Sequence, residues 1–412
     1  MKKIKKSLRR ILLCTILLSF LLADYAAARM TFRIDKIEES NVQEHSAEIT
    51  IEASKISGGK WNLPYITAHS AILMDAQTGD ILYEREAHKK RPIASTTKIL
   101  TAILAIELAD LNEVAVVSEK ADRVGESSLY LNKGEKIKLG ELIEGALLRS
   151  GNDACVAIAE QTAGSLDEFI RLMNKKALAL GARNSNFVNP HGLPDDNHYS
   201  TAYDLALIAR YAMDNPVFSE IVAQKYSVIS FEEPAKSETV KNTNKLLWNY
   251  PFADGIKTGT TNAAGKCLVA SASYQGRRLI CVVLNAPDRF GDAQRLLQWG
   301  LDNSEIIRLG KKGERITEYV APGLKIPVIL AEDAEICVEK SKVQAIQVQT
   351  QLKQNLYPPI KKGDVLGQYH IMFDGKILKT IPLLAEQDSL GSTINFSGRL
   401  NVVFDQILDL IT

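Results

Sequence analysis

The sequence predicts an α+β fold in which helices lie on both faces of one mixed antiparallel sheet, followed by a small all-β domain. Two observations predict this fold. Apolar hairpin patterns before residue 90 and after residue 265 flank a middle stretch with helical periodicity, so strands from both ends of this region are expected to join one sheet beneath the helices. After residue 310, short alternating segments with turn signals replace the helical patterns.

The composition is that of a globular protein that binds its partners through a local site. The 412 residues are 46% hydrophobic and 24% charged, and the formal net charge is +1. A chain in which neither sign of charge dominates is not expected to bind nucleic acid. The six histidines are scattered, and no Cys/His cluster has the spacing of a zinc site, so no metal or other cofactor is expected.

Residues 1–28 are predicted to be a secretory signal. Six Lys and Arg residues precede an apolar run over residues 11–23, and Ala26-Ala27-Ala28 provides a small-x-small cleavage site. We therefore expect an exported protein that works outside the cytoplasmic membrane, with a retained N-terminal anchor as the alternative. The polar, aperiodic residues 29–63 are expected to form a flexible spacer.

A hairpin and then a buried helix are expected to open the first domain. Residues 69–75 and 81–84 are predicted strands that flank the turn residues 77–80. From Ile99 to Leu108 the sequence is apolar almost all round, which predicts a helix inside the core.

Ser95 and Lys98 stand at the start of this helix. Their i,i+3 spacing places both side chains on one face, with Cβ atoms about 5–6 Å apart. A serine becomes a nucleophile when a base takes its proton, and a lysine can be that base if burial or a nearby cation lowers its pKa. The alternative is a capped helix start with a surface lysine. A second Ser-x-x-Lys, Ser57–Lys60, contains a Gly pair and is expected to be linker.

The middle of the chain is expected to be a helical layer. Helix patterns and caps follow a short predicted strand at 114–117, and they cover residues 139–148, 165–181 and 201–215.

A second apolar hairpin, 266–274 and 277–285, precedes a helix around 292–301. With the hairpin turn at Gln275-Gly276, Cys267 faces Leu284 rather than Cys281. We therefore expect buried free thiols instead of disulfides.

Two further polar motifs fall on this scaffold. Ser150-Gly151-Asn152 lies between two predicted helices, where the alternative is an ordinary turn with Asn152 as helix cap. Lys257-Thr258-Gly259-Thr260 lies just ahead of the strand 266–274 and is expected at the start of that strand or in the turn into it. Gly259 there would let another element approach the backbone closely. A solvated loop is the alternative.

Ser-x-x-Lys, Ser-x-Asn and Lys-Thr-Gly in this order form the signature of penicillin-binding proteins and serine β-lactamases. The chain resembles the low-molecular-mass penicillin-binding proteins that act as D-alanyl-D-alanine carboxypeptidases. The resemblance runs from about Pro64 to about Leu301 and includes residues 189–193 and 264–271. It implies a β-lactamase/transpeptidase-like domain over residues 64–305, and residues 310–390 are similar to the small C-terminal β-domain of these proteins.

The resemblance also implies a reaction and its catalytic residues. Ser95 would attack the carbonyl of the penultimate D-alanine of a peptidoglycan stem peptide, with Lys98 as base. Ser150 would relay a proton to the leaving amine, and water would hydrolyse the acyl-enzyme. β-Lactam antibiotics would acylate the same serine.

Substrate binding is expected from the other two motifs. Asn152 would hydrogen-bond the substrate's amide backbone. Lys257, with Thr258 and Thr260, would bind the free carboxylate, and its charge would lower the pKa of Lys98. Gly259 completes this motif, and the backbone N–H groups of Ser95 and Thr260 would form an oxyanion hole. His191 is interpreted as a structural loop histidine.

Three other functions share these motifs. A class A β-lactamase would need a Glu to activate water, but no Glu-x-x-Leu-Asn stands between the second and third motifs. A DD-endopeptidase or transpeptidase would use the same acyl-enzyme with another acceptor. A catalytically silent penicillin-binding sensor is disfavoured by the intact polar set.

The C-terminal part is predicted to be β-structure followed by one amphipathic helix. Strands are expected at 326–330 and 343–352, and a hairpin is expected at 369–372 and 377–382 around an Asp374-Gly375 turn. In residues 395–412, apolar side chains recur at i, i+3, i+4 and i+7 from Leu400, so this helix could lie on a membrane surface. Packing on the β-domain or on a partner is the alternative.

Overall fold

The computed structural model describes residues 63–321, 324–354, 356 and 359–389. The predicted signal segment, the second Ser-x-x-Lys at Ser57–Lys60 and the amphipathic helix at 395–412 lie outside the described residues. So does the predicted spacer, except for its last residue.

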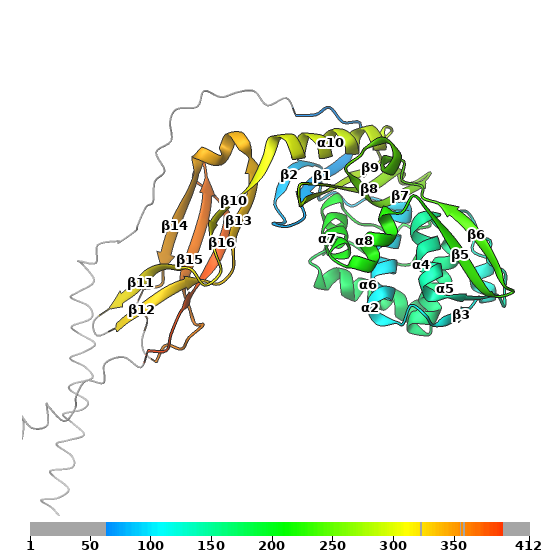
Figure 1. The fold of residues 1–412 in the computed structure, drawn as a ribbon, viewed down its shortest axis with the longest axis horizontal. Coiled ribbons are helices and arrows are strands. Elements are labelled where there is room, and N and C mark those ends of the chain that lie inside the picture. Colours follow the sequence, from blue (N-terminus) through cyan, green and yellow to red (C-terminus); the bar gives the residue numbers. More distant parts are fainter. Residues whose placement is uncertain (1–62, 322–323, 355, 357–358, 390–412) are drawn as a thin grey trace, which may run out of the picture.

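An antiparallel five-stranded sheet forms the centre of the first domain, and it joins strands from both ends of this region (Figure 1). The two hairpins predicted from the sequence are both present and meet through β1 and β9. The strand order is β2 (Ile81–Arg85), β1 (Ser70–Asp75), β9 (Arg277–Leu284), β8 (Gly265–Tyr274) and β7 (Ala253–Thr261). Strand β7 is therefore an edge of the sheet.

Helices lie on both faces of this sheet, as predicted. On one face, α10 (Arg289–Asn303) packs over β8 and β9 in a core of its own. The larger helical layer lies on the other face (Figure 1). It contains α2 (Lys98–Leu108), α4 (Leu139–Leu148), α5 (Asn152–Ala163), α6 (Leu166–Ala179), α7 (Ala202–Met213) and α8 (Pro216–Ala223), with the short α3 (Glu119–Asp122) and α9 (Leu246–Asn249) at its margins.

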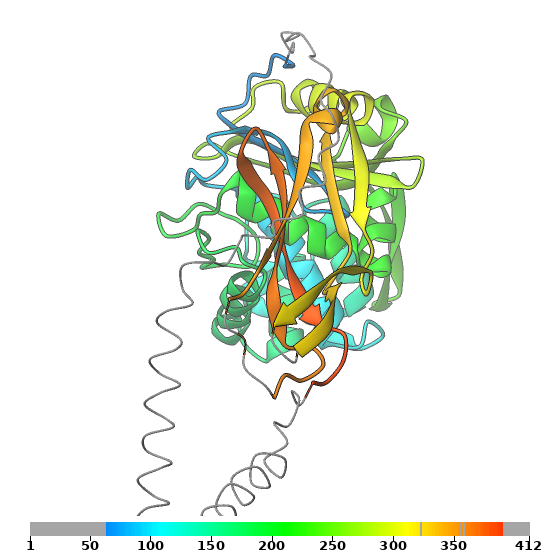
Figure 2. The same ribbon diagram turned by 90° about the vertical axis from the view of Figure 1, so that its left-hand side faces the viewer.

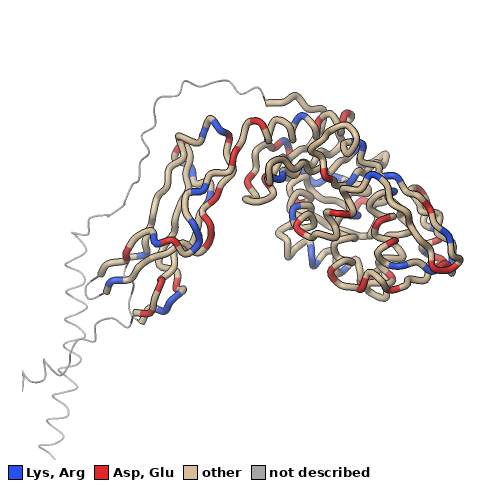
Figure 3. Tube along the Cα trace, viewed as in Figure 1, with Lys and Arg blue, Asp and Glu red and all other residues tan. Residues whose placement is uncertain are grey.

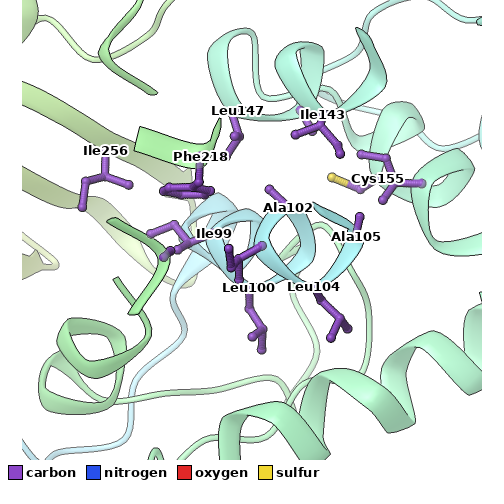
Figure 4. Close-up of a cluster of buried hydrophobic side chains, with 14 of the residues drawn as sticks. Ile99, Leu100, Ala102, Leu104, Ala105, Ile143, Leu147, Cys155, Phe218 and Ile256 are labelled. Carbon is purple, nitrogen blue, oxygen red and sulfur yellow. The ribbon is translucent and has the colours of Figure 1, made fainter. Parts of the chain in front are cut away.

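Helix α2 is buried because its sequence offers almost no polar face. All residues from Lys98 to Ala105 are buried, and Figure 4 shows α2 surrounded by side chains such as Ile143, Phe218 and Ile256 from neighbouring elements. The helix follows a short 3-10 helix, η2 (Ala94–Thr97). Burying this apolar helix fixes the chain segment that precedes it, and that segment carries Ser95.

The predicted helix caps are present. Ser165 Oγ accepts a hydrogen bond from Glu168 N at the start of α6, and Thr201 accepts one from Asp204 N at the start of α7. These bonds satisfy backbone donors that have no partner inside the helix. Helix α7 ends before Pro216, which is the first residue of α8. At this first position the backbone N–H has no partner inside the helix, so a proline, which lacks it, loses no hydrogen bond.

A second, four-stranded sheet packs beside the helical layer. It consists of β3 (Val114–Val116), β4 (Lys136–Lys138), β5 (Tyr226–Glu233) and β6 (Lys236–Lys241). The β5–β6 hairpin was not predicted, because most residues of β5 are exposed or only half-buried and no apolar alternation marks them.

The predicted position of the Lys257–Thr260 motif was wrong in one respect. The motif does not begin the strand 265–274 and is not a turn. It lies within β7, a separate strand whose residues Lys257, Thr258 and Gly259 pair with Val269, Leu268 and Cys267 of β8.

The cysteine prediction is confirmed. Ala270 pairs with Cys281 and Leu268 with Val283, so the register of the hairpin keeps Cys267 and Cys281 apart. The four cysteines of the described residues, Cys155, Cys267, Cys281 and Cys337, are buried free thiols.

The C-terminal part is all-β with its own apolar core, as predicted. One five-stranded sheet has the order β11 (Arg315–Ala321), β12 (Leu324–Leu330), β16 (Lys376–Ala385), β15 (Val365–Phe373) and β14 (Ile346–Leu352), and a second pairs β10 (Ser304–Gly310) with β13 (Ala334–Glu339). The strand predicted from residue 343 begins at Ile346, after the 3-10 helix η3 (Lys340–Ala345). Figure 2 shows these strands in front of the helical domain.

Continuous secondary structure joins the two parts, because β10 begins directly after α10. The boundaries expected at 305 and 310 stay predictions. Basic and acidic residues are interspersed along the chain in both parts (Figure 3). In the part of the chain that the structure describes, no helix is long and apolar enough to cross a bilayer. Within the same ranges, no three His, Cys, Asp or Glu side chains gather as a metal site requires.

Candidate active site

Ser95 and Lys98 face each other at the entrance to α2. Ser95 lies in η2 and is partly exposed, whereas Lys98, the first residue of α2, is fully buried. The Nζ atom of Lys98 is 3.0 Å from Ser95 Oγ. The predicted pairing on one helix face is therefore present, and the alternative of a surface lysine is wrong.

The other contacts of Lys98 orient its amine. Its Nζ donates to Asn152 Oδ1 and to the backbone carbonyl of His191, both at 2.7 Å. These two oxygens can only accept, so they take two N–H groups of a neutral amine. The lone pair of that amine then points to Ser95 Oγ, where it can accept the hydroxyl proton.

Burial is the main cause that lowers the pKa of Lys98, because a buried ammonium loses its hydration. Cys155, Asp153 and Glu126 act in the opposite direction through their negative or potentially negative charge. The sequence had suggested a neighbouring cation, Lys257, as a second cause, but only desolvation lowers the pKa of Lys98. The repulsion between the two lysines instead lowers the pKa of Lys257.

Lys257 is the second fully buried lysine of the site. Its pKa lies well below the usual value because of burial and, next, the charge of Lys98. Repulsion between the two amines disfavours protonating both of them. The Nζ of Lys257 donates to Thr258 O at 3.1 Å.

Ser150 and Asn152 lie in the turn between α4 and α5. Ser150 is nearly buried and has a left-handed backbone, with φ of +72°. No hydrogen bond joins its hydroxyl to Lys98, whose Nζ contacts only the three groups named above within the described residues. Asn152 is the first residue of α5 and is not its cap, since Gly151 holds the N-cap position.

The amide of Asn152 contacts the protein on both sides. Its Oδ1 accepts from Lys98, and its Nδ2 donates to Gly125 O at 2.9 Å. One N–H of Nδ2 remains for a substrate carbonyl. Asn152 thus holds the base in place in addition to the substrate role suggested by the sequence.

Strand β7 lies against η2, and Gly259 allows the close approach. A Cβ atom on Gly259 would lie 3.0 Å from both Ile93 O and Ser95 N. Thr258 is nearly buried and its hydroxyl lies 2.7 Å from Thr243 Oγ1, whereas Thr260 is exposed. The structure therefore brings the third motif next to Ser95.

Sheet geometry directs the N–H of Thr260 toward the same space. Ala286 N donates to Lys266 O at 2.8 Å, so the backbone groups of Lys266 point to the β9 side. In an antiparallel pair, the partner Thr260 then directs its own N–H and C=O away from β8, to the open edge of β7. Strand β7 packs on η2 at the neighbouring Gly259, so we expect the N–H groups of Ser95 and Thr260 to be able to bind one oxyanion.

Arg289 is a site residue that the sequence did not predict. It begins α10, and its Nη1 donates to Gly259 O and Thr260 Oγ1, both at 2.8 Å. It makes no ion pair with any carboxylate of the described residues. A cation beside Thr260 suits the carboxylate of a substrate. No motif marks Arg289, since its contact with β7 arises only through the fold.

The Asn189–Leu193 loop supports the site through its backbone. Thr101 Oγ1 donates to Pro190 O at 2.6 Å, next to the bond from Lys98 to His191 O. The His191 ring accepts from Leu193 N at 3.2 Å, and burial lowers its pKa to about 3. The ring is thus part of the loop's own structure, while the carbonyl of His191 contacts the base.

Comparison with known proteins identifies two families along the chain. The family model of D-alanyl-D-alanine carboxypeptidase matches residues 59–288. The model of the penicillin-binding protein 5 C-terminal domain matches residues 303–389.

Individual relatives agree with these matches. D-alanyl-D-alanine carboxypeptidase DacF of Bacillus subtilis is 34% identical, over 78% of this chain and 85% of the relative. D-alanyl-D-alanine carboxypeptidase DacC of Escherichia coli is 33% identical, over 83% of this chain and 87% of the relative. Among solved structures, penicillin-binding protein 5 of Haemophilus influenzae has a TM-score of 0.72 at 32% identity and covers 80% of this chain and 99% of that one. The Streptomyces K15 DD-transpeptidase has a TM-score of 0.56 at 32% identity and covers 59% of this chain and 100% of that one.

Proposed function

The chain belongs to the D-alanyl-D-alanine carboxypeptidase family of serine peptidases, and we propose that Ser95 is its nucleophile and Lys98 the base that activates it. Substrates of this family are peptidoglycan stem peptides that end in D-Ala-D-Ala. The observation that carries the assignment is the geometry of Lys98, whose two carbonyl contacts leave its lone pair directed at Ser95 Oγ.

Acylation follows from this geometry. Ser95 Oγ bonds to the carbonyl carbon of the penultimate D-alanine while its proton passes to Lys98 Nζ. The carbonyl oxygen takes the negative charge and is stabilised by the N–H groups of Ser95 and Thr260. The C–N bond then breaks, and the proton moves to the leaving amine of D-alanine.

Ser150 is proposed to carry that proton from Lys98 to the leaving amine. It does not contact Lys98 within hydrogen-bond distance, so the relay requires a small rotation of its side chain or a bridging water. Water then attacks the acyl-enzyme with Lys98 again as base, and Ser95 is regenerated.

The terminal carboxylate of the substrate is proposed to bind at Lys257, Thr258, Thr260 and Arg289. A bound carboxylate favours the protonated form of Lys257, which repulsion by Lys98 otherwise disfavours. Arg289→Ala is expected to raise KM for a peptide with a free C-terminal carboxylate and to leave KM for the amidated peptide little changed. An equal rise in KM for both peptides would show that Arg289 does not bind the substrate's carboxylate.

A D-alanine release assay tests the reaction. Purified protein with a D-Ala-D-Ala peptide is expected to release free D-alanine, and Ser95→Ala is expected to release none. An added amine acceptor distinguishes transpeptidation, which the similarity to the Streptomyces K15 DD-transpeptidase makes the second candidate. Transfer to the amine without free acid product would overturn the carboxypeptidase assignment.

The protein is further proposed to work outside the cytoplasmic membrane and to contact it through residues 395–412. The support is the signal pattern of residues 1–28 and the unbroken apolar stripe from Leu400 to Ile411. A mature chain that ends at Leu390 is expected to lose vesicle binding and to keep its peptidase activity on soluble substrate. Equal partitioning of both chains to vesicles would contradict the anchor.

A further inference from the structure

The residue before the nucleophile has an unusual backbone. Ala94 has a φ of +49°, in the left-handed region that residues with a Cβ rarely adopt. Such a conformation is unfavourable for a residue with a Cβ and persists only where surrounding contacts hold it. Because Ala94 immediately precedes Ser95, its conformation sets the direction of the Ser95 side chain and of the Ser95 N–H.

A short chain of buried hydrogen bonds ends at the Ala94 carbonyl. Thr97 Oγ1 donates to Ala94 O at 2.9 Å, and His198 Nε2 lies 2.8 Å from the same hydroxyl. Val188 N donates to His198 Nδ1 at 3.2 Å.

These contacts fix the His198 tautomer. Nδ1 accepts a hydrogen bond from the Val188 N–H, so the proton of the neutral ring is on Nε2, which donates to Thr97. The hydroxyl of Thr97 in turn has one proton, and it is given to Ala94 O. The three hydrogen bonds therefore all run in the same direction from donor to acceptor, from Val188 through His198 and Thr97 to Ala94.

The environment keeps this arrangement rigid. Thr97 is fully buried and His198 nearly so. Burial lowers the pKa of His198 to about 4, so the ring is neutral at pH 7. Gly192 packs against the same carbonyl and against the Thr97 hydroxyl, where an added Cβ would stand 2.0 Å from Ala94 O and 2.9 Å from Thr97 Oγ1. The left-handed turn is thus held by a hydrogen bond and confined by packing.

We infer that His198 is a positioning residue for acylation, which acts through Thr97 to hold the left-handed turn at Ala94 and thereby aims Ser95 at the substrate carbonyl. This inference rests on the proposed role of Ser95 as nucleophile. Without His198, the Thr97 hydroxyl would be free to rotate away from Ala94 O. The Nε2–H of His198 donates to a lone pair of Thr97 Oγ1 and so leaves the Thr97 proton directed at Ala94 O. Without this hydrogen bond, Ser95 samples orientations that do not react, so the chemical step slows while substrate binding is retained.

A matched pair of variants tests the inference. Thr97→Val keeps the shape of the side chain and removes the hydroxyl, whereas Thr97→Ser keeps the hydroxyl. For D-alanine release, Thr97→Val is expected to lower kcat about tenfold with KM within about twofold, and Thr97→Ser is expected to stay within about twofold of wild type in both. His198→Phe is expected to match Thr97→Val, and the double variant to lose no more than either single one, since both break one chain.

A third variant controls for loss of stability. Asn174 holds the backbone N and O of Phe187, at 2.9 and 2.8 Å, and makes no hydrogen bond with Thr97 or His198. It is linked to His198 only through the edge-on packing of the Phe187 ring. Asn174→Ala is expected to lower the melting temperature and to keep kcat. Thermal melts identify the temperature at which all variants are folded, and kinetics are compared there.

The outcomes separate the two levels of the account. Wild-type kcat in Thr97→Val and His198→Phe would overturn the positioning role, as would a fall in kcat of Asn174→Ala equal to theirs. Loss of activity in Thr97→Ser equal to that in Thr97→Val would also overturn it. Penicillin labelling that persists in Ser95→Ala would instead contradict the proposed nucleophile, whatever the Thr97 variants do.

Discussion

Lys98 can act as a base because two carbonyl oxygens and a low-dielectric environment surround its amine. One oxygen belongs to Asn152, which the Ser-x-Asn motif marks in the sequence. The other is a backbone carbonyl at His191, and no side-chain pattern can mark a carbonyl. The chemistry of this single residue therefore depends on one group that the sequence predicts and one that only the folded loop supplies.

Glu126 is one of the charges that raise the pKa of Lys98. This exposed residue lies between Gly125 and Ser127, whose carbonyls accept hydrogen bonds from Asn152 at 2.9 and 2.8 Å. Its negative charge favours the protonated amine and so raises the pKa of Lys98, against the lowering by burial.

Replacing Glu126 by Gln is expected to lower the pKa of Lys98. The base must be neutral to act, so the acid limb of the kcat/KM profile should move to lower pH, and less so at high salt. Glu119→Gln, another exposed carboxylate on the surface, serves as the control and should leave the limb in place. An unmoved or upward-shifted limb in Glu126→Gln at low ionic strength would contradict the assignment of Lys98 as the titrating base.

At the scale of elements, the close packing of β7 on η2 is the contact that assembles the site. Gly259→Ala would place a Cβ 3.0 Å from Ile93 O and Ser95 N. Because both atoms belong to the backbone, the strand must move away, and the oxyanion donors then separate. We expect a fall of about a hundredfold in the rate of penicillin acylation, which is the loss typical of removing one oxyanion donor.

Gly140→Ala in α4 is the matched control, since its Cβ would stand at an ordinary 3.4 Å from Leu111 O. It should acylate at the wild-type rate. A Gly259→Ala enzyme that is as fast as Gly140→Ala would show that β7 tolerates displacement and that Thr260 N–H is not a required donor.

The same strand shows where sequence reasoning stops. The two apolar hairpins and α2 are visible in the sequence because buried apolar residues recur with the period of their element. Strand β7 buries Lys257 and Thr258, so this part breaks the apolar pattern and was predicted at the start of the next strand or in the turn into it. Local rules fail at this position because function, and not packing, selects its residues.

The contacts of Arg289 and His198 with the site could not be predicted from the sequence for a related reason. Each contacts the site across the fold, Arg289 from the start of α10 and His198 from the loop after α6. Motif spacing describes residues close together in one element. It carries no information on which loop lies next to which strand.

At the scale of the whole molecule, one arginine joins the two parts of the chain. Arg277 of β9 donates to the buried carboxylate of Asp75 at 2.8 Å, to Ser304 O and Oγ at 2.8 and 2.7 Å, and to Cys337 Sγ at 2.8 Å. The backbone N–H of Cys337 also donates a hydrogen bond to Asp80 Oδ2 at 2.6 Å. The first sheet is thus tied to β10 and β13 by polar contacts that require a defined orientation.

Arg277→Ala is expected to reduce the free energy of unfolding by about 3 kcal/mol, because it leaves the carboxylate of Asp75 buried without its counter-ion. Urea titration measures this change. Arg315→Ala removes a comparable pair with Glu386 on the surface, where both side chains are more than a third exposed, and should cost less than about 1 kcal/mol. Equal small losses in the two variants would mean that the junction is not a stabilising contact.

The central claim, that Ser95 is acylated with Lys98 as its base, is tested most directly by the mass of the protein after incubation with benzylpenicillin. The account predicts one added penicillin on the wild type, located on Ser95 after proteolysis. It predicts no adduct on Ser95→Ala, and an adduct on Lys98→Arg that forms about a hundredfold or more slowly, since arginine cannot give up its proton. An adduct on another residue, or wild-type speed in Lys98→Arg, would contradict it.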